Sequence, residues 1–496
     1  MLLRATLFAA ALAIAGVAAA EPPKPDVTVA GEITGADHQT YREVPFDVPE
    51  GTERITVTLT YDKSNRTVVD MGVWDPARFR GWSGGTRDRF TIAPSDATPG
   101  YLAGALPSGR WRVLLGVPNV RKESRAAYSV NVFFDRTGQS RASAAIADPP
   151  IKAVPGWYRG DLHMHDAHSD GSCQSRGCRK VPCPLFRAVA AAAETELDFI
   201  AVTDHNTTSH FGGLRELQPY FDTLLLIPGI EVTTFGGHAN IFGPTRFVDF
   251  RVGTPDVADI GTLQRDVAAS GAILSLNHPA LPSGEQCMGC GWTWPDTDYG
   301  KVTAIEAING TMTEGPFAGL GFWYARLNEG HRLTGIAASD NHDPDVAPGN
   351  PPPGAVPIGR PRTVVHAPAL SMPAILNGIR GGNVFIDIEG TRTRLLEVEA
   401  VADERRAMMG EILPGRRPTT IRTHVADVAG SFVELILNGQ PSGVRRPVTS
   451  DDARLTLTLN AEQACGWTAV NVRNGDGKLL LVGNPIYLSC DTVAPR

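Results

Sequence analysis

The sequence predicts an α/β protein of several domains, with a unit of alternating strands and helices between two β-rich regions. Residues from about 157 to 387 alternate short apolar runs with amphipathic stretches, which is the pattern of βα units. The regions on both sides contain short, partly alternating apolar runs separated by Gly, Pro, Asn and Asp, which is typical of β-sandwiches. The chain has 496 residues, a length that suits roughly two to four domains.

The composition is that of a soluble globular protein, with 42% hydrophobic and 20% charged residues. The net charge of −7 argues against a general polyanion-binding surface, so no nucleic-acid surface is predicted. This charge does not exclude a single anionic substrate that is neutralised by metal ions.

The first 20 residues have the organisation of a secretory signal. Arg4 forms a short positive region, Leu7–Val17 is apolar, and three alanines precede Glu21, the expected start of the mature chain. A membrane anchor is the alternative, but this apolar segment is short for crossing a bilayer. We therefore expect a periplasmic or secreted protein without stable membrane insertion after the signal is cleaved.

Residues 27–140 are expected to form a first β-sandwich or jelly-roll, after a Pro-rich linker at 21–26. Runs such as RITVTLTYD, RWRVLLGV and YSVNVFF have the length and the partial alternation of strands. The Gly-rich, basic segment 80–90 is interpreted as a connecting loop. A loop that reaches over a neighbouring site is the alternative.

Residues 155–390 are expected to form the central α/β domain, and residues 391–496 a smaller β-sandwich. In the central domain the apolar runs predict strands at 198–203, 223–228, 272–276, 302–308, 333–338 and 363–366. The amphipathic stretches predict helices at 184–196, 254–270, 317–329 and 372–380. After residue 390, runs such as LLEVEAV and SFVELILNG return to the β pattern.

The seven cysteines suit an exported chain, in which disulfides are chemically permitted. Cys465 and Cys490 stand alone in the last region and are expected to pair. Cys287 and Cys290 form a CxxC in a Gly-rich loop. The remaining three are Cys173, Cys178 and Cys183. This odd number leaves one thiol free, paired between chains or bound to metal, and local disulfides are favoured over a zinc knuckle.

Short patches of His, Asp and Glu directly follow the apolar runs of the central domain. In a barrel of βα units the carboxyl ends of the strands converge on one mouth, so these side chains are expected to lie together. A catalytic zinc usually takes about three protein ligands, and the patches offer more than that. They therefore predict a multinuclear metal centre. The positions concerned are His163, His165, Asp170, Asp204, His205, Glu231, His238, His278, Asp340 and His342.

The remaining histidines have simpler interpretations. A lone His is most often a surface group, and this is the interpretation of His210 and of four others, His38, His331, His366 and His424. His168 lies inside the first patch and is either a substrate contact or a surface group. His238 is favoured as a ligand because it lies seven residues after Glu231.

Taken together, HMHDAHSDG, VTDHN, the Glu of GIEVTT, LNHP and SDNH resemble the motifs of the PHP (polymerase and histidinol phosphatase) superfamily. The segments GDLHMH, FIAVTDHN and GHANIFG and the β-rich N-terminal region resemble the exported CehA/McbA (carbaryl hydrolase-like) branch. The superfamily resemblance covers residues 157–387, which is under half of the chain.

This resemblance implies a distorted (β/α)7 barrel with two or three divalent ions of zinc, manganese or iron. It places one ion on His163, His165, Glu231 and Asp340, and a second on Glu231, His238 and His278, with Glu231 bridging. It places a third ion on Asp170, His205 and His342. Asp170 stands where some relatives have His, and a carboxylate there favours harder ions such as manganese.

The chemistry expected of such a centre is hydrolysis by a hydroxide that bridges two ions, because the ions lower the pKa of bound water. Glu231, Asp340 and His342 are the candidate catalytic residues. Asp204, Glu306 and Asn309 are expected to orient the ligands. Arg360 and Arg362 are candidates for holding an anionic group, with ordinary surface charge as the alternative.

The sequence therefore predicts an exported metal-dependent hydrolase acting on a small-molecule ester, with phosphoester hydrolysis as the first choice. Hydrolysis of a carbamate or carboxylic ester at the same centre is the alternative. A non-catalytic surface or metal-binding protein is the alternative from another class. No Gly-rich phosphate loop or Gly-x-Ser-x-Gly elbow is present in the sequence. The oligomeric state is not predicted.

Overall fold

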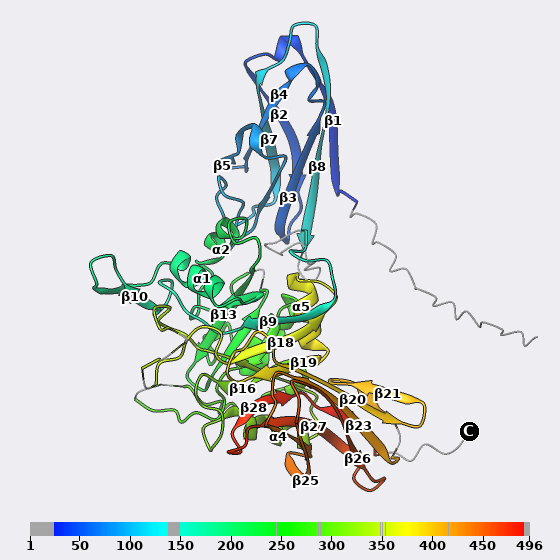
Figure 1. Ribbon diagram of the computed structural model, residues 1–496. Helices are drawn as coiled ribbons and strands as arrows, with labels where there is room; N and C mark the ends of the chain where they lie inside the picture. The colour runs from blue at the N-terminus through cyan, green and yellow to red at the C-terminus, as the bar shows by residue number, and fades with distance from the viewer. Residues whose placement is uncertain are drawn as a thin grey trace, which may run out of the picture.

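The computed structural model describes residues 24–136 and 149–490, apart from the single positions 245, 286, 288, 348, 350, 353 and 415. The expected signal segment, residues 1–20, lies outside this part of the chain, and so do residues 137–140 of the expected first domain. Figure 1 shows a β-sandwich above a central part that carries the helices, with further β-sheets below it. None of the helices in the described residues is long and apolar enough to span a bilayer.

The N-terminal region is a sandwich of two four-stranded antiparallel sheets. In β8 (Arg125–Arg136) alternate side chains are buried, which is the pattern of a sheet with one face on a core. The core between the sheets is centred on Trp111 and Phe90, both almost fully buried. The first sheet has the order β1 (Val27–Thr34), β8, β3 (Thr52–Tyr61), β6 (Arg89–Ile92), and the second β2 (Thr40–Val48), β7 (Gly109–Asn119), β4 (Val68–Trp74), β5 (Phe79–Trp82).

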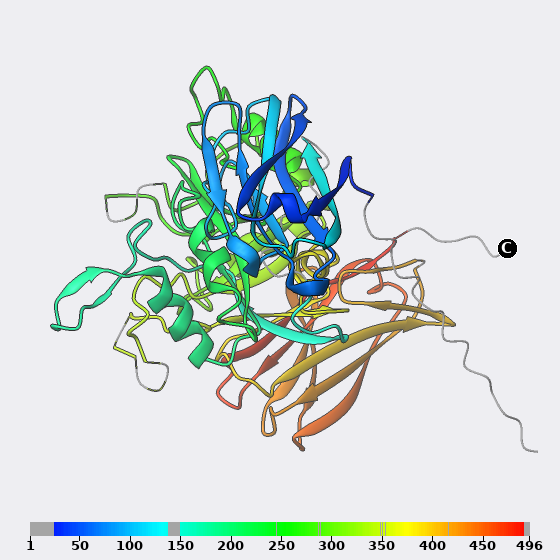
Figure 2. The same cartoon turned by 90° about the horizontal axis from the view of Figure 1, so that it is seen from above.

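A buried ion-pair cluster joins this sandwich to the central part. Asp96, just after β6, accepts hydrogen bonds from Arg54 of the sandwich at 2.6 and 3.0 Å and from Arg215 of helix α2 (Phe211–Leu217) at 2.6 Å. All three side chains are mostly buried. Figure 1 shows α2 at the lower end of the sandwich, and Figure 2 shows the sandwich lying over the central part.

The central part contains one long mixed sheet with few helices. Its strands in spatial order are β17 (Thr334–Ala338), β16 (Ala304–Asn309), β15 (Ile273–Leu276), β14 (Gly237–Phe242), β13 (Leu225–Thr234), β12 (Phe199–Val202), β9 (Gly156–Asp161), β18 (Arg362–Ala367) and β19 (Val384–Asp387). The other helices are α1 (Leu185–Glu194), α3 (Ile260–Ala269), α4 (Gly319–Asn328) and α5 (Met372–Arg380). The six predicted strands and four predicted helices of this region overlap these elements.

Local sequence explains where the helices begin. Ser371 precedes α5, and its side chain accepts a hydrogen bond from the backbone N–H of Ala374, while Pro373 occupies the first turn. Asp259 caps α3 in the same way, through the N–H of Thr262. The alanine-rich sequence of α1 favours a helix by its intrinsic propensity.

The described residues do not show the regular alternation of parallel strands and helices that a (β/α)7 barrel has. The strand pairs β9–β12, β12–β13, β15–β16 and β16–β17 are parallel, but β14 is antiparallel to both of its neighbours and β18 to β9. A hairpin without a helix joins β13 to β14. The sheet still curls toward itself, because Met164 pairs with Asn341 and the Thr363 hydroxyl bonds to the backbone of Ala337.

The C-terminal β-region is joined to the central sheet and does not stand apart as a separate sandwich. β19 pairs with β28 (Leu479–Gly483), so that one 15-stranded sheet crosses the expected boundary at residue 390. The sheet continues through β27 (Gly466–Arg473), β24 (Phe432–Leu437) and β25 (Gln440–Pro447), with β29 (Ile486–Leu488) and β22 (Ile412–Leu413) at its side. A second sheet packs on it, with the order β21 (Arg405–Met408), β20 (Leu395–Ala402), β23 (Thr419–Ala426), β26 (Asp452–Leu459). Hydrogen bonding between distant strands decides this continuity, and periodicity cannot reveal it.

Three disulfides lie in the described residues. Cys465 pairs with Cys490, as expected, and Cys287 pairs with Cys290. Cys173 pairs with Cys183 and links β10 (Ser172–Gln174) to β11 (Lys180–Pro182), a hairpin that follows the first His-rich patch. Cys178 is exposed and outside these pairs.

Candidate metal centre

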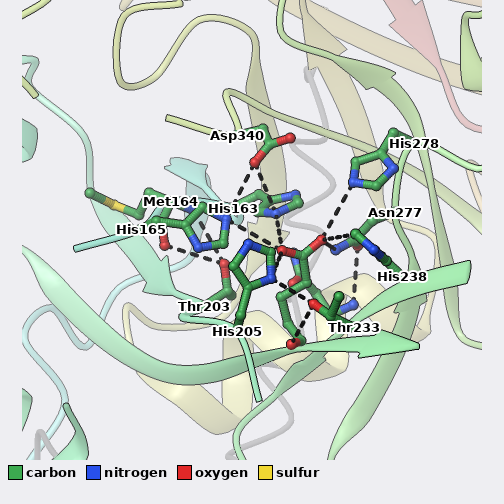
Figure 3. A network of polar contacts seen from close by, with 12 residues as sticks. His163, Met164, His165, Thr203, His205, Thr233, His238, Asn277, His278 and Asp340 are labelled. Atoms are coloured by element: carbon green, nitrogen blue, oxygen red, sulfur yellow. Dashed lines mark hydrogen bonds and ion pairs between the residues drawn. The ribbon is translucent and has the colours of Figure 1, made fainter. Parts of the chain in front are cut away.

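The centre of the site is the buried carboxylate of Glu231, which lies close to five imidazole rings. Figure 3 shows these five histidines gathered in one place. The two oxygens of this carboxylate face different rings. Oε2 lies 3.4 Å from Nε2 of His163, 3.4 Å from Nε2 of His165 and 2.9 Å from Nδ1 of His205. Oε1 lies 3.3 Å from Nδ1 of His238 and 3.4 Å from Nε2 of His278. Glu231 therefore stands between two groups of histidines, as a bridging ligand would.

Asp340 completes the first group. Its Oδ1 lies 3.2 Å from Nε2 of His163 and 3.3 Å from Nε2 of His165. Asp340 follows β17, and its backbone has a positive φ of 55°, while His278 after β15 has a φ of 28°. Such conformations are uncommon for residues other than glycine and concentrate at functional sites.

A third group lies at the open edge of the site. Oδ1 of Asp170 lies 3.4 Å from Nε2 of His342 and 3.6 Å from Nε2 of His205. The side chains of Asp170 and His342 are 58% and 40% exposed, whereas those of His163 and His165 are fully buried. The exposed group is therefore where a dissolved molecule reaches the cluster.

The donor set fits divalent ions. Nδ1 of His163 faces the carboxylate of Glu306, an acceptor, so this nitrogen carries a proton, and in the neutral ring Nε2 has the lone pair that a cation would bind. Nε2 of His163 and Nε2 of His165 are buried and have no hydrogen-bond partner among the described residues. Two ligand atoms at about 2.0–2.1 Å from a tetrahedral ion are about 3.3–3.4 Å apart, which is close to most of the separations seen here. A cation between the lone pairs and the carboxylates would remove their mutual repulsion.

Further side chains hold the ligands in place. Glu306 in β16 accepts from Nδ1 of His163 at 3.1 Å, and its other oxygen accepts from the backbone N–H of His278 at 2.8 Å and from Asn309 at 3.0 Å. Asn309 also donates to Asp340 at 3.3 Å. A carboxylate that accepts from the second nitrogen of a ligand histidine fixes the ring orientation. Glu306 and Asn309 thus occupy the orienting positions that the sequence suggested.

Asp204 acts on the cluster through an intermediate side chain. Ser169 donates to Oδ1 of Asp204 at 2.6 Å, and the same hydroxyl lies 3.3 Å from Nδ1 of His165. Asp204 is fully buried and orients His165 indirectly through Ser169.

Arg362 and His210 differ from their predicted surroundings, whereas the candidate roles of Arg360 and His168 stay predictions. Arg362 is buried and donates to the backbone carbonyls of Gly359 and Thr391 and to that of Thr195, so it supports the fold and does not hold a substrate. Arg360 lines a cavity of about 500 Å³ with Gly310 and Lys478, apart from the predicted ligands. His168 pairs with Asp166, outside the cluster around Glu231. His210, interpreted as a surface group, is fully buried because α2 packs it against β12 and β13.

The electrostatics of the cluster keep its carboxylates ionised. Burial by itself would raise the pKa of Glu231, but the imidazoles of His163, His205 and His238 hold this pKa well below its ordinary value. Burial likewise opposes ionisation of Asp340, and His163 and His165 reverse the effect, so its pKa also lies well below the ordinary range. The site therefore offers negative oxygens to a cation at neutral pH.

Two supporting residues carried no distinct signal in the sequence. Asn277 donates to Oε1 of Glu231 at 3.0 Å and directly precedes His278. Asp161, fully buried, accepts from the backbone N–H groups of His163, Ser339 and Gly359 and so joins the first motif to the chain after β17. Both lie inside quoted motifs, where their position beside a ligand was the available signal.

Comparison with known proteins adds two distant structural neighbours. No protein-family model and no curated protein matches the chain. A solved two-domain protein from Bacteroides vulgatus, described as containing a predicted PHP-like metal-dependent phosphoesterase, is 18% identical with a TM-score of 0.36, covering 68% of this chain and 95% of that one. A second structure, from Bifidobacterium adolescentis, is described by inference as a metal-dependent phosphoesterase. It is 12% identical with a TM-score of 0.27, and the match covers 40% of this chain and 92% of that one. At such low scores neither likeness assigns a family or an activity to this chain.

Proposed function

We propose that this protein is a metal-dependent hydrolase of the PHP type that cleaves an ester bond, with a phosphoester as the preferred substrate class. The observation that carries the proposal is the buried carboxylate of Glu231 with five imidazoles within 3.4 Å, divided between its two oxygens. A structural carboxylate has no need of five such neighbours, whereas a ligand shared by two ions does.

The proposal assigns nine ligands. His163, His165, Glu231 and Asp340 would hold one ion. Glu231, His238 and His278 would hold a second. The third set is Asp170, His205 and His342, to which His165 is also close. Zinc, manganese or iron would suit these mixed nitrogen and oxygen ligands.

Bound divalent ions supply Lewis acidity and lower the pKa of a water molecule, so that it serves as the nucleophile near neutral pH. The protein's own side chains then have separate tasks. Glu306 and Ser169 hold His163 and His165 in orientation, as their hydrogen bonds to Nδ1 of the two rings require. Nδ1 of His342 faces the carbonyl oxygen of Asp340 at 2.9 Å, which fixes the proton on Nδ1 and leaves Nε2 directed toward Asp170. The open edge at Asp170 and His342 is the place where substrate binds.

The open third group favours a phosphoester over an uncharged ester. A phosphoester brings negative oxygens to the site, and a third cation at the exposed edge would neutralise them. A carbamate or carboxylic ester carries no such charge, and two ions are enough to activate water and polarise its carbonyl. Carbamate or carboxylic ester hydrolysis is therefore the second candidate.

The test uses metal-replete full-length protein with added Mn²⁺ or Zn²⁺ and three substrates. These are p-nitrophenyl phosphate, bis(p-nitrophenyl) phosphate and 1-naphthyl N-methylcarbamate. We expect turnover of a phosphoester that falls at least about 100-fold in Glu231→Gln and is unchanged in His331→Ala, a half-buried histidine outside the site. Turnover of the carbamate alone would select the second candidate. A protein that binds metal but hydrolyses none of the three would be a metal-binding protein, and the proposal would be wrong.

We also propose that the protein is exported to the periplasm or secreted. The signal-like segment at residues 1–20 and the three disulfides support this, because disulfides persist in oxidising compartments. Protease protection of the protein in intact cells, lost when the outer membrane is opened, tests a periplasmic location.

A further inference from the structure

A second cluster of ligand-type side chains lies beside the Glu231 centre and is distinct from its nine ligands. It consists of Asp166 and His168 from the loop after β9 and Asp204 from the loop after β12. Each residue offers one ligand atom, and these atoms lie within 4.8 Å of one another. We call these three residues the Asp166 cluster. His210, which precedes α2, lies beside it.

Each carboxylate of the Asp166 cluster has one satisfied and one unsatisfied oxygen. Oδ1 of Asp166 accepts from the backbone N–H of His168 at 2.7 Å and lies 2.7 Å from Nδ1 of the same residue. Oδ1 of Asp204 accepts from the Ser169 hydroxyl at 2.6 Å and from the N–H of Asp166 at 3.0 Å. The Oδ2 atoms of both residues are buried and have no hydrogen-bond partner among the described residues. Both side chains are fully buried.

Among the described residues, Oδ2 of Asp166 and Oδ2 of Asp204 are the only buried carboxylate oxygens without a hydrogen-bond partner. Asp161 is equally buried, and backbone N–H groups reach both of its oxygens. Asp96 is paired with two arginines. Within the described part of the chain, the ion pairs of Asp166 and Asp204 involve histidines only. Two adjacent buried carboxylates without a firm counter-charge repel each other, and a cation between them would remove this repulsion.

His210 provides an independent sign of a cation. Its Nε2 lies 3.2 Å from the carbonyl oxygen of Val202 and 3.0 Å from that of Gly229, and since carbonyls only accept, this nitrogen carries the proton. In the neutral ring Nδ1 then has a lone pair, which is buried and faces Oδ2 of Asp204 at 3.5 Å. This lone pair and the carboxylate oxygen of Asp204 repel each other. A positive ion next to that oxygen would offset the repulsion.

We propose that Asp166, His168 and Asp204 form a further binding site for a divalent cation of the Mn²⁺ or Zn²⁺ class. The mixed set of two carboxylates and one imidazole suits these ions, whereas Ca²⁺ requires six or more oxygen ligands. His168 is the most exposed of the three, so the ion enters from its side. The site does not depend on the hydrolase activity proposed above.

The role of this cation is to join two loops that carry the main centre. The loop of Asp166 also carries His165 and Asp170, and the loop of Asp204 carries His205. Ser169 connects the cluster to His165, since its hydroxyl donates to Asp204 and lies 3.3 Å from Nδ1 of His165. The site therefore positions ligands and does not contact substrate.

The decisive experiment is anomalous diffraction from crystals of the full chain grown with Mn²⁺. We expect an anomalous peak between Asp166, His168 and Asp204, in addition to peaks beside Glu231. Peaks beside Glu231 with none at the Asp166 cluster would overturn this inference and leave the proposed function intact. A peak at the Asp166 cluster alone would support this inference and count against the proposed function. Peaks at neither place would overturn both.

Bound metal counted by mass spectrometry after dialysis provides a second test. His168→Ala changes a partly exposed side chain and is expected to fold, as unchanged circular dichroism will verify. We expect this variant to lose one equivalent of Mn²⁺ relative to the wild type, with the matched control His331→Ala losing none. Asp166→Asn, which keeps the shape and removes the charge, should give the same loss. A wild-type metal count in both Asp166→Asn and His168→Ala would contradict the inference.

Discussion

Replacement of Glu306 by Gln tests whether the metal centre depends on residues that never touch the ion. The Glu306 carboxylate is buried and serves three donors, Nδ1 of His163, the backbone N–H of His278 and the amide of Asn309. Gln has almost the same volume, but one oxygen becomes an NH₂ group. Whichever way the amide points, a donor faces a donor, so at least one of these bonds is lost.

The expected magnitude follows from the kind of bond that is lost. A hydrogen bond to a charged group contributes about 1.5–3 kcal/mol, and loss of the partner of a ligand histidine typically weakens metal binding about 10–100-fold. The two estimates agree, since 10–100-fold corresponds to about 1.4–2.7 kcal/mol. We expect Glu306→Gln to bind Zn²⁺ 10–100-fold more weakly and to lose activity at subsaturating metal.

The assay is competition with a chromophoric zinc chelator at pH 7. The matched control is Glu404→Gln, at an exposed position in the turn between β20 and β21, which should keep wild-type affinity. Thermal unfolding of the metal-free proteins separates an effect on folding from an effect on the ligands. If folded Glu306→Gln bound Zn²⁺ within twofold of the wild type, the proposed orienting role of this carboxylate would be refuted.

Three further predictions concern stability. Asp96→Asn should lower the free energy of unfolding by about 3 kcal/mol or more, because it leaves Arg54 and Arg215 buried without their partner. Burial would raise the pKa of Asp96, but these arginines lower it below 3.8. The stabilisation by the Asp96 carboxylate is therefore complete above about pH 4 and is lost as the pH falls further. Unfolding curves from pH 7 to 3 should show a smaller loss of stability on acidification in the variant than in the wild type. The double variant Cys465→Ser/Cys490→Ser opens a loop of 25 residues. Its free energy of unfolding, measured by chemical denaturation under oxidising conditions, should be about 3 kcal/mol lower than that of the wild type. An unchanged denaturation midpoint would argue against this disulfide. Removal of metal with EDTA should lower the melting temperature of the wild type, since ligands that bind the native state stabilise it by about 2.7 kcal/mol at 100 times Kd, and an equal shift in Glu231→Gln would contradict the assigned centre.

The elements of the central part could be predicted well because their signals are local. The apolar run at 333–338 and the amphipathic stretch at 372–380 match β17 and α5 closely. The hairpin of β13 and β14 was missed. Glu231 and His238 lie inside these strands and not beyond their ends, because the chain reverses in a two-residue turn at Phe235 and Gly236. A turn of this kind leaves no helical period to detect.

Local sequence determined which residues are of ligand type, since His163, His165 and the other patches are recognisable by composition and by their place after apolar runs. Only the tertiary structure decided which oxygen of Glu231 faces which imidazole, that Arg362 serves backbone carbonyls, and that His210 is buried beside Asp204. The physical reason is that a strand's periodicity specifies a face of the chain, whereas a contact depends on strand pairing and on the path of loops between residues far apart in sequence. The same reason explains why the periodicity at 391–496 predicts packed β-sheets but does not show that one of them continues the central sheet, through the pairing of β19 with β28.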